Sequence, residues 1–111
     1  MESKMFSTLA AVSLVSGRLL CSFSDMHELA EWVMGYPIWT HEFGHRPMMA
    51  QVRNALLQQH PALASYCDID AENWRERGEE ASLQLGAELL ITKGASEREL
   101  DPISTLVAML N

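Results

Sequence analysis

Cysteine is scarce in this sequence, and its two occurrences form no recognisable pair. Cys21 and Cys67 lie far apart and show no CxxC spacing. Small domains that rely on disulfides carry many more cysteines, and cysteine-based metal sites usually bring closely spaced ones. We therefore expect both thiols to be reduced and mainly structural, which is the usual state in a cytosol.

Long hydrophobic runs are missing as well. The apolar stretch 9–15 is short and contains Ser13, and Glu2 offsets Lys4 in the region before it. A secretion signal needs a positively charged start, and a membrane-spanning helix needs about 20 apolar residues. We expect neither, and we expect a cytoplasmic protein without a membrane partner.

Basic residues are few and scattered. The chain has 8 Lys and Arg against 15 Asp and Glu, a formal net charge of −7, and no basic cluster. Direct binding of nucleic acid depends on Lys and Arg side chains that neutralise phosphates, so we do not expect it. An acidic surface suits a basic protein partner, although the charge also has the simpler role of keeping a small protein soluble.

The length and apolar content suit one compact domain. Hydrophobic residues make up 48% of the 111 positions, and no repeat, low-complexity tract or linker divides them. A chain of this size buries roughly two-thirds of the surface that its unfolded form exposes. We therefore expect a single domain over residues 1–111.

Apolar periodicity predicts mainly helices. Residues 7–20 show a helical stripe, although β-favouring valines and Gly17 leave a strand as the alternative. The clearest helix has Ser24 as its cap and ends at Gly35. Its buried face is expected to comprise Met26, Leu29, Ala30 and Val33.

Start and stop signals predict the remaining elements. Pro47 opens a helix that ends at His60, and a short helical turn follows over residues 61–66. Asp70 is expected to cap a helix over 71–85 that has Trp74, Ala81 and Leu85 on its inner face and ends at Gly86. A strand over 88–92 and a last helix from Asp101 complete the list. The expected class is α+β, predominantly helical, with about five helices and one or two short strands.

One motif suggests chemistry. The segment HEFGH, residues 41–45, resembles the HExxH signature of the zincin metalloproteases. On an α-helix, positions i and i+4 share a face, so His41 and His45 would hold zinc while Glu42 activates the bound water. A third ligand would be sought downstream, at His60, Glu72 or Glu76.

The context of this motif argues against a zinc site. Gly35 and Pro37 stop the preceding helix, and Pro47 follows His45 closely. Within a continuing helix, the Pro47 ring would clash with the carbonyl of Phe43 at a cost of about 3 kcal/mol. We therefore expect at most about one and a half helical turns here, with the histidines in a loop and no cofactor.

Residues 12–63 show a second sequence pattern. Its residues are Gly17 to Leu20 (GRLL), Gly35, Thr40, His41, Gln59, His60 and Pro61. In this pattern the chain resembles a family of small uncharacterised proteins carried by phages, prophages and plasmids. The family usually has another residue after Thr-His, and His45 is not part of its pattern, which makes HExxH a local coincidence.

The resemblance implies a context rather than an activity. Accessory proteins of mobile elements often act on host machinery, and some inhibit CRISPR or other defence systems by binding protein surfaces. The implied function is a non-enzymatic protein that binds and inhibits a host protein complex in the host cytoplasm. The alternatives are a minimal zinc hydrolase and a self-associating accessory protein, such as a homodimer.

Two groups of residues are candidates for the interface. Aromatic residues gather around the break after the second helix and dominate binding hot spots elsewhere. They are Trp32, Tyr36, Trp39 and Phe43. An acidic helical face could imitate nucleic acid toward a basic groove, and it comprises Glu72, Glu76, Glu79 and Glu80. A packed core and a solvated face are the respective structural alternatives.

The zinc hypothesis has a direct test. Because the prolines oppose a shared helical face, we predict no stoichiometric zinc in the purified protein and the same metal content in His45→Ala. Elemental analysis of both proteins measures this. One zinc per chain that disappears in the variant would contradict the prediction.

Overall fold

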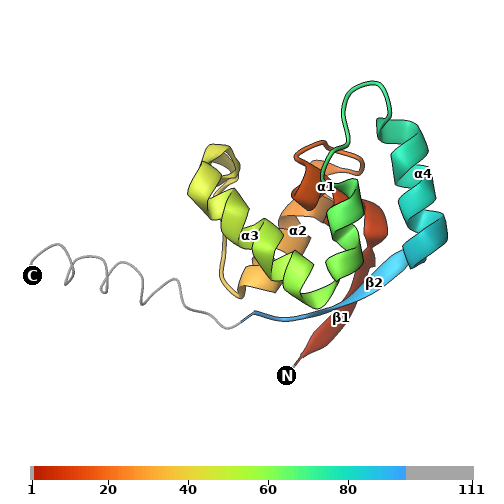
Figure 1. The fold of residues 1–111 in the computed structure, drawn as a ribbon. Helices are drawn as coiled ribbons and strands as arrows, with labels where there is room; N and C mark the ends of the chain where they lie inside the picture. The colour runs from red at the N-terminus through yellow and green to blue at the C-terminus, as the bar shows by residue number, and fades with distance from the viewer. Residues whose placement is uncertain (1, 95–111) are drawn as a thin grey trace, which may run out of the picture.

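The structure is a computed structural model that describes residues 2–94. Its central element is the helix that begins directly after Ser7. The elements are β1 (Ser3–Ser7), α1 (Thr8–Ser16), α2 (Phe23–Met34), η1 (Thr40–Gly44), α3 (Arg46–Gln59), η2 (Pro61–Tyr66), α4 (Trp74–Leu85) and β2 (Glu88–Thr92), where η denotes a 3₁₀ helix. Figure 1 shows the helices gathered on one side of the β1–β2 ribbon. The predicted class, mainly helical α+β, is confirmed, and the helix expected from Asp101 lies outside the described residues.

Helix α1 is buried on almost every side. Thr8 and residues 10–15 are all buried, and α1 packs against α2, α3, α4, η2 and β1. The Ser7 side chain accepts a hydrogen bond from the Leu9 N–H (3.2 Å), and Gly17, at φ 78°, ends the helix. The predicted helix is therefore correct and the strand alternative is wrong. The helix ends at Ser16, four residues before the predicted end at Leu20.

Helix α2 begins and ends on local signals. Its buried residues, Met26, Leu29, Ala30 and Val33, are those that the periodicity predicts, and Gly35 ends it in a left-handed conformation. The cap is Ser22 rather than Ser24, because the Ser22 hydroxyl accepts the Asp25 N–H at 3.1 Å.

The antiparallel sheet joins the two ends of the described chain. Phe6 lies opposite Leu89 and Met5 opposite Leu90. Phe6, Leu89 and Ile91 are buried, and the Trp32 indole N–H on α2 donates to the Ile91 carbonyl at 2.8 Å. The strand over 88–92 is confirmed. Strand β1 was not predicted, because its partner lies more than eighty positions away and SKMFS has little apolar alternation of its own.

Helices α3 and α4 complete the domain. Pro47 lies in the first turn of α3, His60 ends it and η2 follows, as predicted. Helix α4 begins at Trp74, after a turn, with Asn73 in the cap position instead of Asp70. Among the described residues, none of the helices combines the length and apolarity that crossing a membrane requires.

The end of β2 packs directly on the last turn of α2. The Gly94 N–H donates to the Trp32 carbonyl at 3.0 Å, and a Cβ at Gly94 would lie 2.0 Å from the Val33 carbonyl oxygen. That oxygen is backbone and can move only if the helix or strand shifts. Gly94 is thus required at this contact.

We therefore predict that Gly94→Ala lowers the free energy of unfolding by about 1–3 kcal/mol, as overpacking against backbone does. Urea denaturation measures the change. The matched control is Gly44→Ala, since nothing lies within 4 Å of a Cβ built there. Equal losses in the two variants would show that the close approach is unimportant.

Candidate protein-binding surface

The HEFGH segment forms a short 3₁₀ helix rather than a loop or an α-helix. Thr40–Gly44 makes η1, and His45 then has extended backbone (φ −91°, ψ 108°) before α3 begins. With 3.0 residues per turn, positions i and i+4 point about 120° apart, against about 40° in an α-helix. His41 and His45 therefore do not share a face.

Two of the other proposed zinc-site residues, Glu42 and His60, have structural partners. The Glu42 carboxylate accepts the Trp39 N–H at 2.9 Å, so it caps η1. His60 Nε2 donates to the Leu90 carbonyl at 2.8 Å. Within residues 2–94, no three His, Cys, Asp or Glu side chains lie together in a group that could hold a metal ion.

Two residues of α2 that the sequence did not single out hold this segment in place. His27 Nε2 donates to the Ile38 carbonyl at 2.6 Å, and the Glu31 carboxylate accepts the Ile38 N–H at 2.7 Å. The rings of His27 and Phe23 both contact Phe43, with centroids 5.3 and 5.2 Å away. The i, i+4 spacing of His27 and Glu31 was the available signal.

The four aromatic candidates do not form one surface. Trp32 is half-buried between the lysines Lys4 and Lys93, and Tyr36 is buried, with its hydroxyl near Met48 Sδ. Phe43 packs on α2, as described above. Trp39 alone among them is largely exposed, at 70%. Three of the four therefore have mainly structural contacts.

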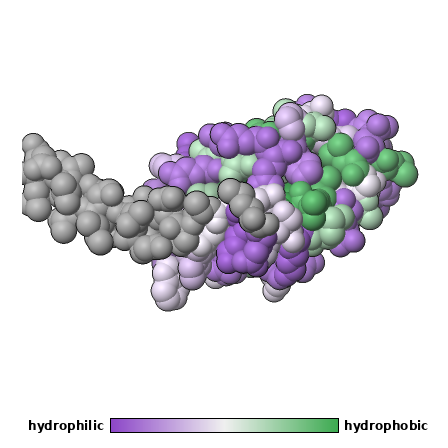
Figure 2. All heavy atoms as spheres, turned by 90° about the horizontal axis from the view of Figure 1, so that it is seen from below, coloured by the Kyte–Doolittle hydropathy of each residue, from purple (hydrophilic) through white to green (hydrophobic). Residues whose placement is uncertain are grey.

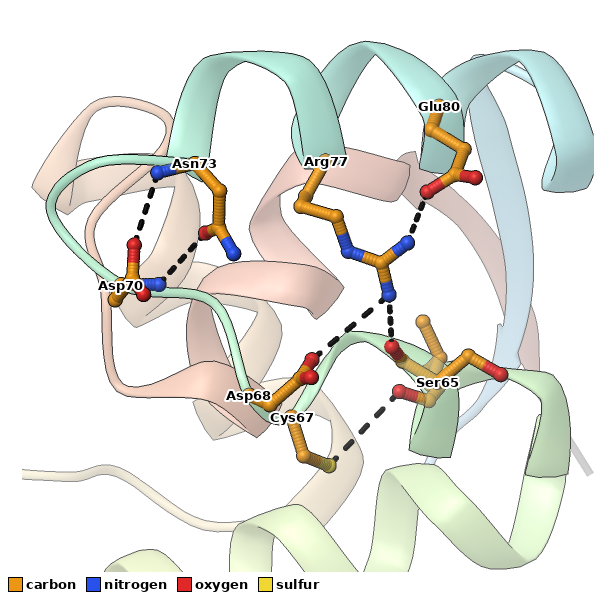
Figure 3. Close-up of polar contacts among 8 residues, drawn as sticks. Ser65, Cys67, Asp68, Asp70, Asn73, Arg77 and Glu80 are labelled. Atoms are coloured by element: carbon orange, nitrogen blue, oxygen red, sulfur yellow. Dashed lines mark hydrogen bonds and ion pairs between the residues drawn. The ribbon is translucent and has the colours of Figure 1, made fainter.

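Helix α4 is tied to η2 by one arginine. The Arg77 guanidinium lies 4.7 Å from the centre of the Tyr66 ring, 3.8 Å from the Asp68 carboxylate, and donates to the Ser65 carbonyl and to Glu80 (Figure 3). These partners span η2 and the following turn. Arg77 thus sets the position of α4 relative to the rest of the domain.

The four acidic candidates are all exposed on or just before α4. Glu80 pairs with Arg77, whereas Glu72, Glu76 and Glu79 have no side-chain ion pair among the described residues. Arg75 is the other base on this helix, and it stacks on Trp74 with 5.1 Å to the ring centre. The acidic character predicted for this helix is therefore present at its surface.

An open apolar groove of about 500 Å³ lies between α1 and α4. Its floor is formed by Leu9, Leu20 and Gly78. The lining also includes two residues of α4, Trp74 and Leu83. Leu83 is 85% exposed and Trp74 is 40% exposed. Figure 2 shows hydrophobic surface gathered toward the end of the molecule where Figure 1 places α4 and β2. Glu79 and Arg75 also line the groove, so one acidic and one basic side chain meet the apolar ones there.

Sequence reasoning missed two of the residues that build this groove. Trp74 was expected on the inner face of its helix but is substantially exposed, because Gly78 and Ala81 form the buried contact instead. Leu83 lies outside the 74, 78, 81, 85 stripe. The signal available in the sequence was that Leu83 is an isolated leucine on the polar side of a predicted helix, which indicates a surface contact.

Both cysteines are unpaired and half-buried. Burial raises the pKa of the Cys21 thiol above its ordinary value, which lowers the fraction of reactive thiolate at neutral pH. This supports the structural role expected for Cys21.

The fold and this surface define a small helix-rich α+β domain with an exposed apolar and acidic helix face. The family model for a domain of unknown function, DUF7736, matches residues 6–65, which is more than half of the chain. The chain therefore belongs to this family, and the residues that carry the phage-protein resemblance lie inside the match. Neither the curated proteins nor the solved structures contain a match to the chain.

The turn before α4 generates a pH prediction. The Asp70 carboxylate accepts the N–H groups of Asn73 (2.9 Å) and Glu72 (2.8 Å), and these bonds lower the pKa of Asp70 below its ordinary value of 3.8. A carboxylate whose pKa is lower in the folded state stabilises the fold at pH values above its pKa in the unfolded state. This stabilisation is lost as the pH falls through its pKa in the folded state.

We predict that the melting temperature of the wild type exceeds that of Asp70→Ala at neutral pH, and that the difference shrinks on acidification below about pH 4. Asp70→Asn keeps an acceptor without the charge and should lie between them. Thermal melts from pH 7 to pH 2 test this. A difference that stays constant across the range would contradict it.

Proposed function

We propose that this chain is a non-enzymatic accessory protein of a phage or other mobile element that binds a host protein complex and inhibits it. The observation that carries the proposal is the exposed groove beside α4, where Leu83 and Trp74 stand beside Glu79 and Arg75 on a helix that exposes further glutamates. The target class that fits is a nucleic-acid-binding defence effector, such as a CRISPR complex.

Apolar anchors supply the affinity in this proposal. Burying an exposed leucine side chain is worth about 1.5–3 kcal/mol, and tryptophan is enriched among the residues that dominate binding energy. Leu83 and Trp74 lie nine positions apart on α4 and line the same groove. A partner that inserts an apolar side chain between them would contact the floor formed by Leu9, Leu20 and Gly78.

The charge distribution supplies the selectivity. Glu79 lines the groove, Glu76 is exposed elsewhere on α4 and Glu72 just before it, and the whole chain carries a net charge of −7. Proteins that hold nucleic acid present Lys and Arg for the phosphates. An acidic helix face attracts such a surface and, once seated, competes with the nucleic acid for it.

The zinc-hydrolase alternative has less support. His41 lies in η1 and His45 is the extended residue after it, so the two do not share an α-helical face, and Glu42 caps η1. Self-association through the groove would bring two acidic faces together, which electrostatic repulsion opposes.

The groove yields a testable variant pair. We predict that Leu83→Glu and Trp74→Ala each reduce capture of the specific partner from host lysate by about tenfold or more, since a buried anchor is worth at least about 1.4 kcal/mol. Quantitative mass spectrometry of material bound to the immobilised proteins measures this. Higher salt should weaken capture by the wild type, because screening reduces the attraction of the acidic face.

The matched control is Leu19→Glu, an equivalent change at a leucine that is 54% exposed in the segment after α1 and does not line the groove. It should capture the partner as the wild type does. Loss in all three variants would point to general damage. Identical capture by wild type and both groove variants, or hydrolytic turnover without any specific partner, would reject the proposal.

A further inference from the structure

The two edges of the β1–β2 sheet differ in how their backbone groups are satisfied. The Lys93 N–H donates to the Glu2 carbonyl at 2.8 Å, and the Thr8 N–H donates to the Ala87 carbonyl at 2.9 Å. In an antiparallel ladder, hydrogen-bonded pairs alternate with non-bonded pairs. With the observed register, Lys4 and Phe6 therefore bond β2, while the N–H and C=O groups of Met5 point away from it.

The outer edge of β2 is sealed by side chains. The Gln59 side-chain amide donates to the Thr92 carbonyl at 3.0 Å and accepts the Thr92 N–H at 2.8 Å. His60 Nε2 donates to the Leu90 carbonyl next along that edge. These two residues at the end of α3 thus occupy positions where a third strand would pair.

The outer edge of β1, by contrast, is not covered by any of the residues that the structure describes. A hollow of about 190 Å³ runs beside it, lined by Lys4, Met5, Phe6 and Ser7 of the strand and by Ala10, Asp25 and Glu28 of the helices. No residue of β2 lines this hollow, so it lies on the free side of β1. Within residues 2–94, no hydrogen bond reaches the N–H or C=O of Met5, whose side chain is 48% exposed.

We propose that β1 accepts an extended, basic segment of a partner protein as a third strand. Strand addition uses main-chain hydrogen bonds for affinity and alternate side chains for selectivity. It would satisfy the outward groups of Ser3, Met5 and Ser7. This surface is distinct from the α4 groove, so the proposal does not depend on the function proposed above.

The side chains around the edge define the partner's pattern. Asp25 and Glu28 lie on the face that also carries Lys4, which bonds Glu28 at 2.9 Å. Two acids against one base leave this side negative, and it fits Lys or Arg. The opposite face presents Met5 beside Leu90, both about half exposed, and it fits an apolar residue. The complementary segment therefore alternates basic and apolar residues.

A second copy of this chain is the less suitable occupant. Pairing β1 with its own copy would bring together two molecules that each carry a net charge of −7. The segment SKMFS offers only one base, Lys4, and that base already bonds Glu28. Charge complementarity therefore favours a different protein with a basic strand.

The test uses a ten-residue probe peptide of alternating valine and lysine. We expect it to slow amide hydrogen exchange of Met5 by about tenfold or more at millimolar peptide, because the Met5 N–H becomes a ladder donor. NMR on the full chain reads this amide directly. The same peptide with every backbone nitrogen methylated keeps its charge but loses its N–H donors on both edges, and it should give little protection. A valine–glutamate peptide should also fail.

Variants of the protein complete the experiment. Asp25→Asn should weaken lysine-peptide binding by about threefold or more, as expected for loss of one exposed charge pair, whereas Asp68→Asn, the same change at an exposed acid that does not line the hollow, should not change it. Met5→Pro removes an outward N–H and should retain the fold but not the protection, while Lys4→Pro removes a ladder donor and should destabilise the sheet. Unchanged Met5 exchange with the lysine peptide, equal protection by its methylated form, or protection that arises only from dimerisation overturns the proposal.

Discussion

The burial of α1 is the constraint on which the rest of the structure depends. Its polar residues are as enclosed as its apolar ones, and each finds a partner nearby. Thr8 donates to the Gly86 carbonyl, while Ser13 donates to the Leu9 carbonyl and accepts the Leu20 N–H. Because α1 is covered by α2, α3, α4, η2 and β1, a polar group left without a bond there would cost about 1–3 kcal/mol. The surrounding elements are therefore arranged to satisfy it.

The position of α4 follows from this central helix and determines the surface. Gly78 brings the α4 backbone close to Leu9, since a Cβ there would lie 3.3 Å from a Leu9 methyl carbon. Arg77 then fixes the helix against η2 (Figure 3). The close contact leaves Trp74 and Leu83 at the rim of a groove instead of in the core. Both α4 and β2 lie outside residues 6–65, the segment matched by the family model.

The sequence motifs acquire structural roles that their letters do not state. Gln59 and His60, which belong to the phage-protein resemblance, seal the edge of β2. The HEFGH segment is a short connection held by His27 and Glu31, and Glu42 is used as its cap. These hydrogen bonds give each of these polar residues a structural role. They leave the exposed apolar side chains and the open strand edge as the features that suit a partner.

The sequence by itself determined the helical class, most of the helix ends and the buried face of α2, because periodicity, proline and glycine act within a few residues. It also showed that Pro47 would prevent a continuous helix through HEFGH. Only the tertiary structure decided that SKMFS pairs with ELLIT and that Trp74 and Leu83 are exposed. Those outcomes depend on contacts between segments that are distant in the sequence. A local residue pattern does not predict the free energy of such contacts. The division is clearest at α4, where the acidic composition was evident but the groove arises from packing against α1.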